Sequence, residues 1–187
     1  GKVDGWQLAG ICEYPIEKTS NPISRIWQRW FAHPKRVVKE INRLVSNNQC
    51  DLVHITDQEQ GHLMPKNCPV PGIITIHDLF HLFPEHLRFS DEVIAVGDTK
   101  PGIVRRRDLQ KLKAGINRAN HLLCNSKHTL EAAEQHFPTV AASRVPLGIE
   151  SAKYHPDNNQ PIKLDLPNKC NLLSLIHISE PTRPYWI

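Results

Sequence analysis

Short apolar runs, separated by amphipathic stretches, recur along most of this chain. The clearest run is Gly-Ile-Ile-Thr-Ile at residues 72–76, which follows two prolines and stops at His77 and Asp78. Four β-branched positions in a row are typical of a strand covered on both faces, as in a parallel sheet. We therefore predict a buried strand that delivers an imidazole and a carboxylate to its C-terminal end.

The same pattern predicts further strands at residues 6–12, 51–56, 121–125 and 144–148. A first helix is predicted to begin after the N-cap Asn21, with Pro22 as its first residue, and to be interrupted at Pro34. A second helical stretch continues to about residue 45, and two further helices are predicted over 103–120 and 127–136. Ser126 stands where the N-cap of the last helix belongs. Residues 83–102, rich in proline and glycine, are predicted to be irregular. The first helix has an apolar stripe that we expect to be core, with a membrane-touching face as the alternative: Ile23, Ile26, Trp27, Trp30 and Phe31.

Alternation of strands and helices from residue 24 onward is typical of βαβ units with a parallel sheet. The fold class predicted is therefore α/β, a Rossmann-like parallel sheet with flanking helices. We assign residues 1–150 to one lobe with a truncated start, and residues 151–172 to a linker and the start of a further lobe. Residues 173–187 resemble a translated sequencing adapter, the alternative being a genuine strand and a proline-rich tail.

Composition narrows the class of protein. The 187 residues are 40% hydrophobic and 22% charged, and no apolar run approaches the roughly 18 residues of a membrane span. Five dispersed cysteines without a Cys-x-x-Cys spacing favour buried thiols in a reducing cytoplasm over disulfides or a zinc site. A net charge of +4 is too weak to imply nucleic acid. It is compatible with an anionic ligand or an anionic membrane surface.

Three segments, in this order, resemble family 4 glycosyltransferases. These segments are Asp-Leu-Val-His at 51–54, Ile-Ile-Thr-Ile-His-Asp-Leu at 73–79, and Ala-Asn-His-Leu-Leu-Cys-Asn-Ser at 119–126, followed by Arg-Val-Pro-Leu-Gly at 144–148 and Tyr-His-Pro at 154–156. Members of the family show an Asp-x-x-His strand, a Thr-x-His-Asp strand end, and a strand ending in serine before a helix. The chain departs from the pattern at Asn120, where aspartate is frequent, and at Leu147, where asparagine is usual.

The resemblance implies the acceptor-side lobe of a two-lobed GT-B enzyme. Such an enzyme moves a sugar from a nucleotide-sugar donor to a carbohydrate or lipid-linked acceptor, with retention of configuration and no metal. By this resemblance the protein is cytoplasmic, with possible peripheral contact at the inner face of the membrane. The family's donor-binding lobe has no counterpart in these residues, so the chain alone is not expected to turn over substrate.

Site residues follow from these motifs and from strand-end chemistry. His77 matches the family's active-site histidine, and an imidazole can orient or deprotonate an acceptor hydroxyl near neutral pH. Asp78 is expected either to hold the ring of His77 or to cap the next turn. Candidate substrate-binding residues are His54 beside His77, Ser126 at a helix N-terminus that could face a phosphate, Gly148 with a positive φ, and Arg105 toward an anionic acceptor.

Two other functions stay open at this point. A metal hydrolase could use His54, His62, His77, His81 and Asp78, although Pro84 and the preceding strand leave little room for the helix that a His-x-x-x-His pair requires. A non-catalytic Rossmann-like binding module is the second alternative.

Overall fold

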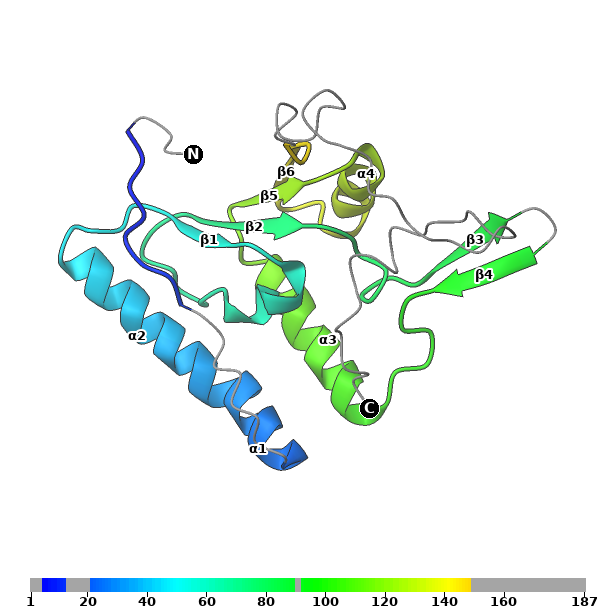
Figure 1. Cartoon of the computed structure of the whole chain (residues 1–187), viewed down its shortest axis with the longest axis horizontal. Helices are drawn as coiled ribbons and strands as arrows, with labels where there is room; N and C mark the ends of the chain where they lie inside the picture. Colours follow the sequence, from blue (N-terminus) through cyan, green and yellow to red (C-terminus); the bar gives the residue numbers. More distant parts are fainter. Residues whose placement is uncertain (1–4, 13–20, 90–91, 149–187) are drawn as a thin grey trace, which may run out of the picture. The chain divides into compact units, whose positions relative to one another are not determined.

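The computed structural model describes residues 5–12, 21–89 and 92–148 (Figure 1). Its elements in chain order are α1 (Pro22–Trp27), the π-helix η1 (Gln28–Ala32), α2 (His33–Ser46), β1 (Val53–Ile55), the 3-10 helix η2 (Gln58–Leu63), β2 (Gly72–Ile76), β3 (Glu85–Phe89), β4 (Glu92–Val96), α3 (Ile103–Ile116), β5 (His121–Cys124), α4 (Lys127–His136) and β6 (Ala141–Arg144). By chain contacts the protein divides into two units, Gly1–Leu147 and Gly148–Ile187.

A parallel sheet of four strands, in the order β1-β2-β5-β6, forms the centre of the first unit. Ile74 of β2 is in register with Ile55 on one side and with Leu122 on the other. The parallel ladders and the flanking helices confirm the predicted α/β, Rossmann-like class. Because all four strands run in one direction, their C-terminal ends meet at a single edge of the sheet.

Burial on this sheet is one-sided. Ile74, Ile76 and Leu122 are fully buried, and they form one core with residues of α2, α3, η2 and α4. From β1 to β6, each new strand is added on the same side of the one before it. Because crossovers between parallel strands are right-handed, all the connections then lie on one face of the sheet. The opposite face, which carries Ile73 and Thr75 of β2, is only partly buried. The expectation of a strand covered on both faces is therefore met on one face alone in the described part of the chain.

The N-terminal helix begins where the sequence predicts. Asn21 caps α1 by accepting a hydrogen bond from the Ile23 amide (2.9 Å), with Pro22 as the first helical residue. Pro34 does not interrupt the helix. Proline has no N–H to donate, and its ring clashes with the carbonyl four residues earlier. The π-helical turn η1 widens the helix just before Pro34, so that α1, η1 and α2 follow one another without a break.

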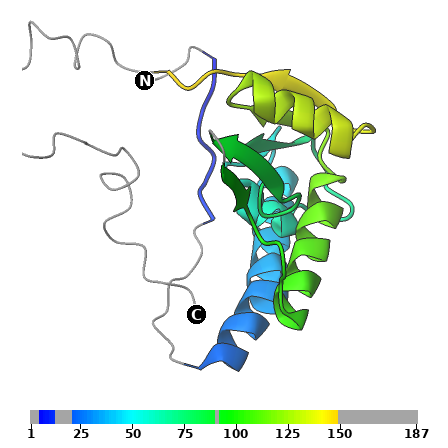
Figure 2. The ribbon, with the colours of Figure 1, turned by 90° about the vertical axis from the view of Figure 1, so that its right-hand side faces the viewer.

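The apolar stripe of the first helix is not core. Trp27 is 60% exposed and Phe31 is 49% exposed, whereas Val37, Ile41 and Leu44 of α2 are buried. Helical spacing alone could not distinguish these two stripes, because it fixes a face and not what covers that face. Figures 1 and 2 show α2 and α3 running alongside one another.

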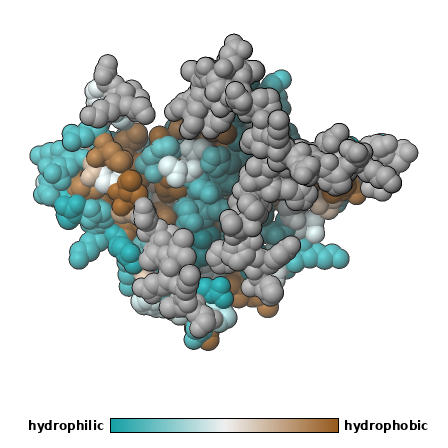
Figure 3. All heavy atoms as spheres, viewed as in Figure 1, coloured by the Kyte–Doolittle hydropathy of each residue, from teal (hydrophilic) through white to brown (hydrophobic). Residues whose placement is uncertain are grey.

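Three predicted segments differ from the structure. Residues 6–12 do not form a strand, and Trp6, Leu8 and Ile11 are exposed. Figure 3 shows hydrophobic surface on the left of this face of the molecule. Residues 83–102 contain the hairpin β3–β4, because proline and glycine stand just outside its strands and not within them. The final strand is Ala141–Arg144, not 144–148: Val145 makes the last backbone bond to Cys124 (2.8 Å), and Pro146 has no N–H to continue the pairing.

No helix among the described residues is long and apolar enough to cross a membrane.

Candidate functional site

The polar strand ends meet in a pocket at the C-terminal edge of the sheet. His77 and Asp78 follow β2, and Asn125 and Ser126 connect β5 to α4. Together with His128 and others they line a cavity of about 220 Å³. In open α/β sheets, ligands bind outside the carboxyl ends of the strands. The pocket therefore lies where open α/β sheets typically bind their ligands.

His77 is held at two points and keeps an accessible ring. Its backbone N–H donates to Gln58 Oε1 (2.9 Å), and its ring Nε2 lies 3.1 Å from the carbonyl oxygen of Thr56. Since a carbonyl can only accept, this contact places the proton of the neutral imidazole on Nε2, and Nδ1 then carries the lone pair. No described residue donates to Nδ1, and the residue is exposed. The imidazole is therefore oriented with an acceptor nitrogen available.

Thr129 ties the two strand ends together. Its side chain is almost fully buried, and its hydroxyl lies 3.3 Å from the His77 carbonyl oxygen and 3.2 Å from Asn125 Oδ1. Ser126 Oγ accepts a hydrogen bond from the Thr129 amide (3.0 Å), which confirms the predicted N-cap. The amides of the first helical turn otherwise lack intrahelical acceptors and carry partial positive charge. The start of α4 is thus fixed beside His77 and favours an anionic group.

Asp78 caps a turn and does not hold the imidazole. Its Oδ1 accepts a hydrogen bond from the Phe80 amide (3.3 Å), which is the second of the two roles expected for it. Across the pocket, His128 Nε2 lies 3.4 Å from Glu85 of β3. Among the described lining residues, the carboxylates of Asp78 and Glu85 and the imidazoles of His77 and His128 therefore give the cavity both acidic and basic groups.

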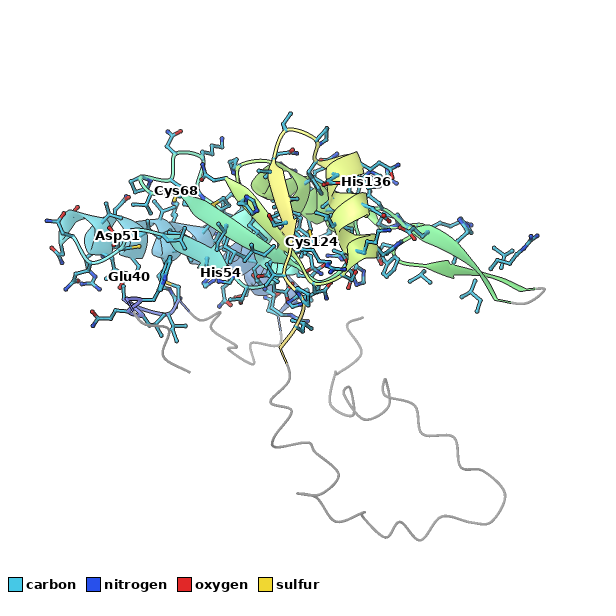
Figure 4. The ribbon with its side chains drawn as sticks, turned by 90° about the horizontal axis from the view of Figure 1, so that it is seen from above. Glu40, Asp51, His54, Cys68, Cys124 and His136 are labelled. Atoms are coloured by element: carbon cyan, nitrogen blue, oxygen red, sulfur yellow. The ribbon has the colours of Figure 1, made fainter. Side chains whose placement is uncertain are left out.

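His54 does not lie beside His77. It stands opposite Ile73, four residues before His77, which corresponds to about 13 Å along the strand. Its Nε2 lies 2.8 Å from Thr75 Oγ1 on the partly buried face of the sheet (Figure 4), and burial lowers the pKa of its imidazole. The expectation that the two histidines share a crevice is wrong, because β1 ends before the edge that β2 reaches.

Arg105 is occupied by the protein itself. Its guanidinium contacts Asp98 (2.7 Å), Asp108 (3.1 Å) and Glu59 (3.3 Å). Burial alone would lower the pKa of Arg105, but hydrogen bonds to Glu59 and Asp98 outweigh it and the net shift is upward. With three carboxylates around it, Arg105 is a structural cation in this arrangement and not one facing a ligand.

Gly148 does not have the positive φ expected of it, and a Cβ there would meet nothing within 4 Å. It begins the second unit and stands at the end of the described chain. Nor do the candidate metal ligands converge: within the described ranges, no three His, Cys, Asp or Glu side chains are grouped so that they could hold a metal ion. His62 is buried in the core, and His81 lies 3.6 Å from Asp98.

Two residues of the site were missed in the sequence. Gln58 is buried and holds the His77 amide, and Thr129 couples α4 to the end of β2. The N-cap at Ser126 is the local signal for Thr129, because an N-cap side chain accepts a hydrogen bond from the amide two or three residues later.

Comparisons with protein-family models, with curated proteins and with solved structures find no significant match for this chain.

Proposed function

We propose that this chain is the acceptor-side lobe of a retaining glycosyltransferase of family 4 type, which transfers a sugar from a nucleotide-sugar to a carbohydrate or lipid-linked acceptor. The observation that carries the proposal is the oriented, accessible imidazole of His77 at the C-terminal end of β2. The ordered motifs of the sequence support it, and the parallel sheet is compatible with it.

His77 is the proposed acceptor-binding and proton-accepting residue. Because Nε2 donates to the Thr56 carbonyl, an acceptor hydroxyl would donate its hydrogen bond to Nδ1. Fixing a hydroxyl in one orientation lowers the entropy lost in reaching the transition state. As the hydroxyl attacks the sugar, Nδ1 would take up its proton, and the Thr56 carbonyl would stabilise the positive charge that develops on the ring.

The start of α4 is the proposed contact for the leaving diphosphate. Ser126 satisfies the Thr129 amide, and the remaining first-turn amides have hydrogen bonds to give to phosphate oxygens. Stabilisation of charge that appears only during the reaction raises turnover and not merely affinity. The donor's sugar and base would be bound by residues of the second lobe.

The test uses the enzyme that contains both lobes, with UDP-glucose, UDP-N-acetylglucosamine and GDP-mannose as donors and release of nucleoside diphosphate as the readout. His77→Ala should lower turnover by about 100-fold or more, which is the size of a general-base effect. His86→Ala is the matched control, because His86 is exposed on β3 and does not line the pocket.

An unchanged turnover in His77→Ala would remove this residue from the mechanism. If instead the donors bind and none releases its diphosphate with any acceptor, the chain is a binding module and the proposed transfer is wrong.

A further inference from the structure

A second cavity lies between α2 and α3, and shares no residue with the strand-end pocket. Its volume is about 520 Å³, within the range of sites for small organic ligands. Leu63, Met64 and Pro65, at the end of η2 and just after it, contribute its apolar lining, with Trp30 and Val38 from the N-terminal helical run. We call this cavity the helical groove.

The charges of the helical groove have one sign. Lys35 of α2, Lys66 after η2, and Lys111 and Arg118 of α3 or its end line it, and no lining residue is acidic. Lys111 Nζ lies 5.4 Å from the ring centroid of Trp30 and 5.5 Å from that of Phe31, so aromatic faces border this cation. Four cations from three segments therefore surround apolar walls.

Arg118 differs from two other arginines of this unit, Arg29 and Arg105, in having no carboxylate partner among the described residues. Arg29 and Arg105 are paired with carboxylates. Arg118 Nε, by contrast, is buried and has no hydrogen-bond partner among the described residues. Burial accordingly lowers the pKa of its guanidinium. A buried N–H donor without an acceptor is unfavourable, and an anion that accepts a hydrogen bond from Nε would remove that penalty.

We propose that the helical groove binds an anionic amphiphile, a phosphate monoester carrying a hydrocarbon chain, with the phosphate at Arg118 and Lys111 and the chain against Leu63, Met64 and Trp30. The cations of the groove favour an anionic group, and its apolar walls favour a ligand that also carries a hydrocarbon chain. The exposed Phe31 ring beside Lys111 extends the apolar surface beyond the groove. The site is independent of the glycosyl transfer proposed above, because it uses no residue of the strand-end pocket.

Isothermal titration calorimetry of the full chain tests the proposal with three soluble probes: lysophosphatidate, inorganic phosphate and lysophosphatidylcholine. Lysophosphatidate should bind at least about tenfold more tightly than either of the others, since only it presents both a phosphate monoester and a hydrocarbon chain. Equal binding of inorganic phosphate, or equal binding of the choline lipid, would overturn the proposal.

Arg118→Met should weaken lysophosphatidate binding by about tenfold or more. The urea midpoint should stay unchanged or rise, because the substitution removes a buried N–H donor that has no acceptor among the described residues. A residue with only a structural role would lower the midpoint instead. Lys35→Gln should weaken binding by a smaller factor, and Lys39→Gln, an exposed lysine on the same helix outside the groove, is the matched control. Unchanged binding in Arg118→Met would overturn the proposal.

Co-sedimentation with phosphatidylcholine vesicles, with and without phosphatidate, identifies the source of the ligand. Sedimentation that requires phosphatidate and is lost in Arg118→Met supports a lipid held in a membrane. Binding of soluble lysophosphatidate without sedimentation supports a free amphiphile. Sedimentation that Arg118→Met does not change, together with calorimetric binding that it does not change, overturns the assignment of the groove.

Discussion

Replacement of Asp108 by alanine should destabilise the fold by about 3 kcal/mol. Asp108 is 6% exposed and accepts four hydrogen bonds: two from Arg29 (2.8 and 3.1 Å), one from the Trp30 indole (3.0 Å) and one from Arg105 (3.1 Å). Removing one partner of a buried ion pair typically costs about 3–5 kcal/mol, because the other charge is left uncompensated. Here Arg105 keeps Asp98 and Glu59, and Arg29 keeps the Glu59 carbonyl, so the lower end of that range applies.

Urea unfolding followed by circular dichroism measures this change. Asp51→Ala, at an exposed position, is the control, and it should change the free energy of unfolding by no more than about 0.5 kcal/mol. Burial would raise the pKa of Asp108, but the Arg29 hydrogen bond outweighs it and the net shift is downward. The contribution of Asp108 is therefore present above its unfolded pKa of about 3.9 and is lost as pH falls through the lower folded value. A loss below about 1 kcal/mol at pH 7, or a loss that Asp51→Ala matches, would refute the reasoning.

Two further predictions concern the same region. Gly115→Ala should destabilise the protein in the same urea assay, because a Cβ at Gly115 would collide with the Gly61 carbonyl. Helix propensity alone predicts the opposite sign, since alanine is the better helix former by about 1 kcal/mol. Gly102→Ala, with open space around it, is the control. Burial, followed by the charge of Arg29, lowers the pKa of His62 from 6.5 to about 4. Between these two pH values the unfolded state binds more protons than the folded state. The free energy of unfolding should therefore fall by about 3 kcal/mol as pH falls from 6.5 to 4. His62→Leu should flatten that part of the pH profile measured by thermal unfolding, and an unaltered slope would contradict the cause.

The sequence predicts correctly those elements whose determinants lie within a few residues. The bounds of β2 and of α4 are those predicted, because Pro71 precedes the first, Ser126 caps the second, and each has a consistent apolar pattern. The parallel sheet followed from the alternation of such segments. Asn21 and Pro22 likewise begin a helix through contacts within three residues.

The failures concern what other parts of the chain supply. Nothing near Trp27 or Phe31 in the sequence reveals whether another element will cover them, so the helical spacing predicts core for a stripe that is exposed. Pro34 predicts an interruption of the helix, although a π-helical turn before it lets the helix continue. The sequence predicts His54 beside His77 because both close an apolar run, yet the register of β1 with β2 separates them. Register, packing and helix type depend on partners distant in sequence.

The segment that most affects the candidate site is η2, which in the sequence has the polarity of a loop. Its Gln58 holds the His77 amide, and the Thr56 carbonyl just before it fixes the His77 ring. Its Glu59 binds Arg105, and its Gly61 lies against Gly115 of α3. Gln58 is buried and Glu59 is half-buried, and their partners lie 19 and 46 residues away in the sequence. Polar groups removed from water require hydrogen-bond partners, and here distant parts of the chain supply them. Since the same short helix is fixed by α3 on one side and positions His77 on the other, a substitution that displaces η2 from α3 should disturb the imidazole as well as the core. Gly115→Ala therefore provides a comparison with His77→Ala in which the site is altered through its support and not through its chemistry.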